Sequence, residues 1–304
     1  MTWMCVTRLG RMALVGPAAP VAIGRGRTHL AAERHRGRCM GTRRRLDAEL
    51  VRRGLARSRE QAADLVTDRR VLVAGQAAAK PATQVTPDDP ITVTEPAGPQ
   101  YASRGGWKLA GALAAFPGLQ VAGRRCLDAG ASTGGFTDVL LRNGAAHVTA
   151  VDVGYGQLAW ALRSDERVTV LDRVNVRQLQ PEQVAPAPDL VTADLSFISL
   201  GLVLPALVRC ATPDADFVLL VKPQFEVGKD RVGAGGVVRD PVLRREAVSA
   251  VAAAAAELGL GVAGLVASPL PGPAGNVEYF LWLRQGAPGL REDELDRAIA
   301  EGPK

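Results

Sequence analysis

Apolar and polar positions alternate along the chain with two different periods, which predict strands and helices in turn. From about residue 103 onward, short apolar runs are separated by longer segments in which apolar residues recur every three or four positions. Strands are predicted at residues 126–128, 147–152, 168–172, 190–194, 217–222, 262–267 and 279–283. Helices are predicted at residues 107–115, 136–143, 200–210 and 241–258. This alternation predicts an α/β fold, in which a largely parallel sheet is covered by helices on both faces.

A smaller unit with a different pattern precedes this region. Its predicted elements are a helix at 44–53 ended by Gly54, a second helix from Ser58, strands at 71–73 and 91–93, and a turn at Ala74-Gly75. Gly54 suits a helix end because glycine accepts a left-handed backbone. Ser58 and Gln61 have the spacing of a capping box. The pattern therefore predicts a compact α+β unit of about fifty residues, in the size range of a small domain.

The patterns divide the chain into five segments. They are residues 1–42 as a disordered extension or a mis-called start, 43–98 as the α+β unit, 99–103 as a linker, 104–285 as the α/β domain and 286–304 as a charged, peripheral tail. Residues 1–39 hold seven arginines, one acidic residue and no sustained period. Such a segment resembles a transit peptide in composition, or is simply disordered. Met40 offers an alternative start.

The charge balance favours an anionic partner. The formal net charge is +6 and the isoelectric point is near 9.5, with only five lysines among the 37 basic residues. The four cysteines form no C-x-x-C pair and there are three histidines, so no zinc site is expected. This cysteine usage fits a reduced, cytoplasmic setting. No apolar run reaches the roughly 18 residues of a membrane span, so no membrane association is expected.

The strongest local motif is a glycine-rich turn between a predicted strand and a predicted helix. Residues 128–136 read D-A-G-A-S-T-G-G-F. Dinucleotide-binding folds use G-x-G-x-x-G, whereas the spacing here matches the D-x-G-x-x-x-G-G-F of S-adenosylmethionine enzymes. Asp152 ends the next strand, where a carboxylate can accept hydrogen bonds from both hydroxyls of a ribose. An ordinary strand–turn–helix with a surface carboxylate is the alternative interpretation.

Two lysines and two acids stand at further element ends. Asp194 and Lys222 each end an apolar strand, Glu278 begins the last strand, and Lys108 opens the first helix of the α/β domain. Any one of them alone could simply mark where the sheet meets water. Together they suit methyl transfer to an alcohol, because a lysine whose pKa is lowered by burial or by a neighbouring cation can accept the hydroxyl proton. Carboxylates would orient the ammonium group, and no metal is required.

These motifs make residues 43–284 resemble the TlyA family, once described as hemolysins and understood as ribosomal RNA 2′-O-methyltransferases. The blocks that carry the resemblance are Arg45-Leu46-Asp47, Gly54, Ser58-Arg59, Ala62-Ala63, Lys80-Pro81, Ser103-Arg104-Gly105-Gly106, Asp128 to Phe136, Asp194 to Ser199, Lys222 to Glu226 and Gly275 to Tyr279. The resemblance implies an S4-type RNA-binding domain followed by an FtsJ-like, Rossmann-like class I methyltransferase domain with a seven-stranded sheet. It also implies S-adenosylmethionine as cofactor, and as substrate a cytidine ribose in 16S or 23S ribosomal RNA or in both.

The resemblance also assigns roles to residues. The catalytic tetrad would be Lys108, Asp194, Lys222 and Glu278, with Lys222 as the base. The cofactor would be held by Gly130, Ala131, Ser132, Thr133, Gly134, Gly135, Phe136, Asp152, Asp172 and Asp194. RNA phosphates would be held by Arg43, Arg45, Arg57, Arg59 and Lys80, which position folded RNA by shape with little base readout.

Two departures and two alternatives accompany this interpretation. The S4 pattern has Gly before the strand at Val71 and Asn-Gly in the following turn, where this chain has Arg69-Arg70 and Ala74-Gly75. A membrane-active hemolysin would need a signal peptide or an amphipathic insertion segment, and neither is found. An RNA-binding protein without activity is disfavoured by the intact tetrad. The glycine-rich residues 228–238 are expected to form a mobile loop near the substrate entrance, and the sequence leaves the oligomeric state open.

Overall fold

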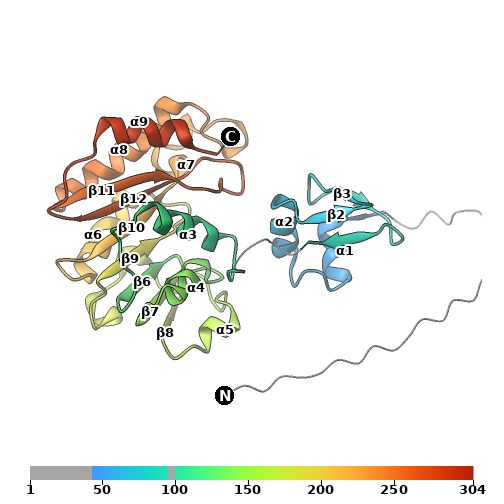
Figure 1. Ribbon diagram of the computed structural model, residues 1–304, viewed down its shortest axis with the longest axis horizontal. Helices are drawn as coiled ribbons and strands as arrows, with labels where there is room; N and C mark the ends of the chain where they lie inside the picture. The colour runs from blue at the N-terminus through green and yellow to red at the C-terminus, as the bar shows by residue number, and fades with distance from the viewer. Residues whose placement is uncertain (1–42, 95–99, 304) are drawn as a thin grey trace, which may run out of the picture. The chain divides into compact units, whose positions relative to one another are not determined.

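The computed structural model describes residues 43–94 and 100–303, which form a smaller and a larger region (Figure 1). The expectations for residues 1–42, including the start at Met40, lie outside the described residues, as do residues 95–99.

The larger region is built on a seven-stranded sheet with the order β11-β12-β10-β9-β6-β7-β8 (Figure 1). Its strands are β6 (Arg125–Ala129), β7 (His147–Asp152), β8 (Val168–Asp172), β9 (Leu190–Ala193), β10 (Asp216–Val221), β11 (Leu260–Ala267) and β12 (Tyr279–Gln285). The five strands from β10 to β8 run parallel, and β12 pairs antiparallel with both β10 and β11. The chain leaves β6 towards β7 and β8, then crosses back to β9 and β10. The order therefore reverses between β6 and β9, where ligands bind in open α/β sheets.

Helices cover both faces of this sheet. They are α3 (Gly105–Ala115), α4 (Gly135–Arg142), α5 (Trp160–Arg163), α6 (Leu200–Cys210), α7 (Pro223–Glu226), α8 (Pro241–Glu257) and α9 (Glu292–Glu301). One apolar core joins the sheet to α3, α4 and α5, and a second joins it to α6, α8 and α9. Neighbouring residues of one strand serve opposite cores, as Cys126 and Leu127 do, because successive side chains of a strand point to opposite faces. The α/β fold class and the seven-stranded sheet are thus confirmed.

The last segment of the chain is part of this fold, although a peripheral tail was expected there. Residues 292–301 form α9, and its Leu295 is fully buried in the core that also contains α8. Leu295 and Ala298 lie on one side of the helix, three positions apart, and face the sheet. Residues 292–301 therefore form a packed helix within the segment that was expected to be a charged tail.

The smaller region contains β1 (Arg44–Arg45), α1 (Leu46–Arg52), α2 (Arg59–Thr67), β2 (Val71–Val73), β3 (Gln76–Ala77), β4 (Gln84–Val85) and β5 (Ile91–Val93). Leu46, Leu50, Val66, Val71 and Val85 form the centre of its core. The predicted strands are present, with β2 between β3 and β5. Ser58 caps α2 by accepting a hydrogen bond from the Gln61 amide.

The predicted first helix begins two residues late. Arg44 and Arg45 pair with β4 as a short strand instead. The backbone amide of Leu46 donates to the carbonyl of Thr83, and that of Asp47 donates to the carbonyl of Pro81. A hydrogen-bonding partner distant in sequence therefore fixes where α1 starts, and helical spacing alone could not reveal it.

Both departures from the S4 pattern fall at left-handed backbone positions. Arg69 has φ of 56° and Ala74 has φ of 50°. Ala74 and Gly75 (φ of 81°) turn the chain between β2 and β3, and such hairpin turns favour Asn-Gly because both residues need positive φ. Arg69 and Ala74 therefore adopt the left-handed backbone that the S4 pattern requires at these positions, at a cost of about 1–2 kcal/mol each.

Candidate active site

The register of the sheet brings the predicted residues to one edge. Asp194 and Lys222 directly follow the ends of the adjacent strands β9 and β10, and Glu278 directly precedes Tyr279 of β12, which pairs with Val221. On the other side of β9, the glycine-rich turn follows β6, and Asp152 ends β7. One row of strand ends therefore carries an acid–lysine set beside a glycine-rich turn.

The four members of the set form two ion pairs. Nζ of Lys222 lies 2.5 Å from Oδ1 of Asp194 and donates a hydrogen bond of 3.1 Å to the Ser196 hydroxyl. Nζ of Lys108 lies 2.6 Å from Oε2 of Glu278. The Lys108–Glu278 pair is closed off, since the Glu278 side chain is only 1% exposed, whereas that of Asp194 is 21% exposed. The two lysine side chains are almost equally buried, at 8% and 10% exposure for Lys108 and Lys222, so the pairs differ mainly in the partial exposure of Asp194.

Helix α3 carries Lys108 to this edge through close contacts at its first turn. A methyl group on Gly106 would overlap the side chain of Tyr101 and touch the carbonyl of Gly135, whereas one on Gly105 would only make an ordinary contact, 3.8 Å from Oδ2 of Asp194. The Ser103-Arg104-Gly105-Gly106 motif thus lets the start of α3 lie against both Asp194 and the start of α4. This packing brings Lys108, from the first helix, to a row otherwise made of strand ends.

The glycines of the 128–136 turn serve protein packing. A side chain on Gly130 would lie 2.6 Å from the carbonyl oxygen of Asp194, and one on Gly135 would meet the Ser103 hydroxyl and the Gly106 amide. A side chain on Gly134 would overlap Leu158 and Leu162. Gly130 and Gly134 also have left-handed φ values, of 86° and 98°. These glycines join the turn, the start of α3 and the loop after β9 into one tight unit.

Asp152 and Asp172 differ in how their carboxylates are engaged. The Asp152 carboxylate accepts hydrogen bonds from the backbone amides of Ser132 (2.8 Å) and Gly154 (2.7 Å). Asp172 forms an ion pair with Arg163 at 2.9 Å, and this hydrogen bond is the main cause that lowers the pKa of Asp172 below its usual value. Asp152 therefore ties the glycine-rich turn to the next loop, while Asp172 fixes α5 to β8.

Asp128, the first residue of the turn motif, is fully buried. Its carboxylate accepts a hydrogen bond of 2.7 Å from the Thr137 hydroxyl on α4. Burial raises the pKa of Asp128 to about 7, which the Thr137 hydrogen bond only partly offsets. Asp128 thus links β6 to the first turn of α4 beneath the glycines.

Sequence reasoning recognised residues 194–199 as a family motif but gave no role to Phe197 within it. Phe197 is 90% exposed, has φ of 64°, and its ring lies 5.2 Å from that of Phe225, three residues after Lys222. Large exposed aromatics held in a left-handed backbone conformation are uncommon and indicate a functional constraint. An isolated Phe in a sequence is more often a core residue, so only exposure could have identified it.

The predicted RNA-contacting residues of the smaller region are all on its surface. Arg45 and Arg59 share the carboxylate of Asp47, at 2.8 and 3.2 Å. The hydrogen bond from Arg45 is the main cause that lowers the pKa of Asp47 to about 2. Arg43, Arg57 and Lys80 are exposed, and no ion pair to them is recorded within residues 43–94 and 100–303. Among the described residues, the charges of these three cations are not offset by a carboxylate, whereas those of Arg45 and Arg59 are, so these three are better placed to bind an anionic ligand.

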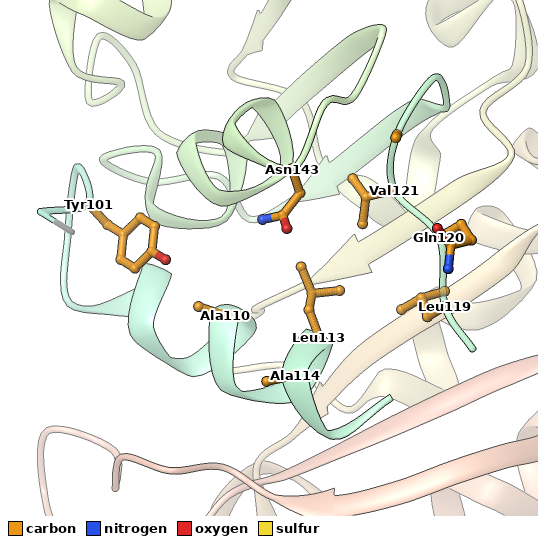
Figure 2. A pocket seen from close by; sticks show the side chains of 9 residues that line it. Tyr101, Ala110, Leu113, Ala114, Leu119, Gln120, Val121 and Asn143 are labelled. Carbon is orange, nitrogen blue, oxygen red and sulfur yellow. The ribbon is translucent and has the colours of Figure 1, made fainter. Parts of the chain in front are cut away.

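A hollow of about 350 Å³ opens elsewhere, between α3 and the segment that leads into β6 (Figure 2). Tyr101, Leu113, Val121 and Asn143 are among its lining residues, and no charged side chain lines it. It therefore offers none of the chemistry of the strand-end set. In the described part of the chain, no group of three or more His, Cys, Asp or Glu residues is placed to hold a metal ion, and no helix could span a membrane.

Two family models match the chain. Residues 101–285 match the FtsJ-like methyltransferase model, and residues 44–91 match the S4 domain model. The S4 match covers most of the smaller region, and the FtsJ-like match covers the larger region to the end of β12 but not α9.

Similar proteins agree with these matches. A protein of Mycobacterium tuberculosis, named 16S/23S rRNA (cytidine-2′-O)-methyltransferase TlyA, is 62% identical over 270 residues, which are 87% of this chain and all of the relative. Hemolysin A of Brachyspira hyodysenteriae is 36% identical, over 78% of this chain and 98% of its own length. The solved structure of a Streptococcus thermophilus protein named as a hemolysin is 38% identical, with a TM-score of 0.69, and the match covers 85% of this chain and 95% of that one.

Proposed function

Because the chain belongs to the TlyA family of FtsJ-like methyltransferases, we propose that it methylates the 2′-hydroxyl of a cytidine in ribosomal RNA with S-adenosylmethionine. The observation that carries the proposal is the Lys222–Asp194 pair beside the glycine-rich turn, in which Asp194 is partly exposed to solvent. Ribosomal RNA as substrate also accounts for the S4 domain and the net charge of +6, and it places the proposed reaction in the cytoplasm.

The residues around the turn suit S-adenosylmethionine. Each oxygen of Asp152 uses one backbone amide, and a carboxylate has about four acceptor positions, so both oxygens can also accept from ribose hydroxyls. Val153 beside it is 74% exposed and offers an apolar surface to a purine ring. Bound there, the cofactor supplies a methyl group on a positively charged sulfur. Asp194 closes the site on the side of the tetrad, since its carbonyl lies against Gly130.

Lys222 is proposed as the base. A ribose hydroxyl becomes a good nucleophile only as its proton leaves, and an amine within hydrogen-bond reach can accept that proton when it is neutral. Asp194 and Ser196 hold Nζ of Lys222 at one position, so the amine is oriented before the ribose arrives. Lys108 and Glu278 add a second, buried pair of charges that fixes the start of β12 against α3. Correct alignment of the ribose hydroxyl with the methyl group would supply much of the rate enhancement.

Phe197 is proposed to stack on the base of the target nucleotide. Enzymes that modify a nucleotide within folded RNA must hold it out of its stack, and aromatic side chains are common stacking partners. The exposed ring of Phe197 follows Ser196, which touches Lys222, so a stacked base would bring its own ribose close to the amine.

The test is methyl transfer to ribosomal subunits by the purified full chain, with ribose methylation mapped by nucleotide. Wild-type protein is expected to methylate a cytidine 2′-oxygen, and Lys222→Ala to lower kcat by about 10²–10⁴-fold while S-adenosylmethionine still binds. Lys222→Arg keeps the positive charge but cannot lose a proton, so it is expected to be as inactive as the alanine variant. Activity of Lys222→Arg near that of wild type would refute the base assignment, and a wild-type enzyme that methylates no ribose would refute the function.

A further inference from the structure

A second hollow, of about 450 Å³, lies beside the turn that leads into Glu278 and β12. One wall is the end of the loop that follows Lys222 and α7, with Val237 and Arg239, and then Arg244 of α8. The opposite wall is the turn at Ala274 to Val277, which leads directly into Glu278, and the end of α9 closes the third side. One wall of the hollow thus leads directly into Glu278, and the other is the far end of the loop that follows Lys222 and α7.

The charge of this hollow is positive. Arg239 and Arg244 are its charged lining residues, and no acidic side chain lines it. Within the described ranges no carboxylate is paired with either: Nη1 of Arg239 donates to the carbonyl of Ala234 at 3.2 Å, and Nε of Arg244 donates to that of Val238 at 2.9 Å. Two other arginines of these segments do have carboxylate partners. Arg231 is paired with Glu246, and Arg245 is paired with Glu292 and Asp296.

The walls of the hollow are held in place. Asn276 is 2% exposed, and its side chain accepts a hydrogen bond from the Val238 amide (2.9 Å) and donates one to the carbonyl of Gly236 (2.8 Å). Residues 228–238, expected to form a mobile loop, are therefore joined at their far end to the turn before Glu278. A site whose charges are fixed before binding loses less entropy when it takes a ligand.

From this placement we propose that the hollow binds a backbone phosphate of the RNA strand that carries the target ribose. The inference rests on the proposed function. Guanidinium groups match the oxygens of a phosphate and keep their charge at every relevant pH. With Ala274, Gly275 and Val277 on the opposite wall, the lining side chains other than the arginines offer nothing to read a base edge. The contact would set the path of the strand past Lys222 without adding sequence preference.

The test compares Arg239→Ala with Arg245→Ala in methylation of ribosomal subunits. Arg245 is the control for loss of an arginine near the hollow. It follows Arg244 on α8, but it does not line the hollow and is paired with carboxylates. Arg239→Ala is expected to raise the KM for RNA about tenfold and to make the salt dependence of RNA affinity shallower by about one phosphate contact, with kcat and S-adenosylmethionine affinity unchanged. Arg239→Lys should recover most of the affinity, and Arg245→Ala should match wild type.

Three results would overturn the inference. The first is an unchanged KM and salt slope in Arg239→Ala, and the second is an equal loss in Arg245→Ala. The third is saturable binding of inorganic phosphate at micromolar concentration that Arg239→Ala abolishes, because the hollow would then be a site for a small free anion. Wild-type methylation in the same assay separates these outcomes from failure of the proposed function itself.

Discussion

The Glu226 carboxylate, on the helix that follows Lys222, accepts a hydrogen bond of 2.5 Å from the hydroxyl of Ser199, on the loop that follows Asp194. Its second oxygen accepts from the backbone amide of Leu200 at 2.9 Å, and burial raises the pKa of Glu226 above its usual value. Besides the Lys222–Asp194 ion pair and the contact of the Phe197 and Phe225 rings, Glu226 therefore also joins the loop that carries Asp194 to the helix that follows Lys222.

Removing the Glu226 connection is expected to impair catalysis without affecting the binding of S-adenosylmethionine. Glu226→Ala loses two hydrogen bonds and leaves the Leu200 amide without its partner, which should lower the free energy of unfolding by about 2 kcal/mol. Without the Glu226 hydrogen bonds the loop that carries Asp194 is held less firmly. We therefore expect kcat to fall about tenfold or more, since a small misplacement of reacting groups lowers the rate strongly. Glu226→Gln keeps an acceptor for the amide and should lie between. Steady-state kinetics and denaturant unfolding measure both effects, and a wild-type kcat in Glu226→Ala would contradict this role.

Gly272 controls the position of Glu278 through its missing side chain. A methyl group there would lie 2.5 Å from Oε1 of Glu278, which is buried and has no hydrogen-bond partner in the part of the chain that the structure describes. Gly272→Ala is therefore expected to push the carboxylate away from Lys108 and to lower kcat while S-adenosylmethionine binding is kept. Gly289→Ala is the control, since nothing lies within 4 Å of the added group. Equal kcat values in the two variants would show that Glu278 tolerates displacement.

Phe197→Ala tests the proposed stacking. Stacking of a base on an aromatic ring contributes about 1–3 kcal/mol, so kcat/KM for RNA should fall by about 5- to 150-fold. Phe197→Tyr keeps the ring and should stay near wild type, whereas Phe197→Leu keeps apolar volume only and should resemble the alanine variant. Because the side chain is 90% exposed, the melting temperature should barely change. Full activity in Phe197→Leu would contradict stacking.

The features that sequence could predict are those in which local pattern and topology coincide. Each core strand is an apolar run with its charged residue at the end, and parallel strands bring such ends to one edge, so Asp194 and Lys222 could be placed together before the structure was known. The resemblance assigned the tetrad as a set. Which lysine pairs with which acid depends on the packing of α3 against the turn, and no spacing along the chain encodes that.

The features that sequence could not predict depend on contacts between distant segments. The start of α1 is set by hydrogen bonds to residues 81–83, and the left-handed Ala74 is stabilised by the pairing of β2 and β3 around it. Helix α9 did carry a signal, because Leu295, Ala298 and Ile299 have helical spacing after three acidic residues in its first turn. The high charge of the segment hides this signal, because charged residues are also typical of an exposed tail.

Asp128 should make the stability of the cofactor-free protein depend on pH in a predictable direction. Its pKa is about 7 in the folded protein, raised by burial from 3.8. Between these values the unfolded chain has released the proton that the folded protein still holds, so unfolding releases a proton. The contribution of Asp128 to stability must therefore fall as pH rises from about 4 to about 7, and stay at its lower level above that. A carboxylate with a lowered folded pKa would show the opposite slope.

Asp128→Asn isolates this effect from other titrating groups. Asparagine keeps an acceptor for the Thr137 hydroxyl, at 2.7 Å in the wild type, and carries no charge at any pH. The difference in unfolding free energy between variant and wild type, measured in denaturant at several pH values, should grow in favour of the variant from about pH 4 to 7. One pKa unit corresponds to about 1.4 kcal/mol, so the growth should be on the order of 2–4 kcal/mol. A difference that stays constant across this range would mean that the buried carboxyl is ionised throughout, and that the Thr137 hydrogen bond outweighs the cost of burying its charge.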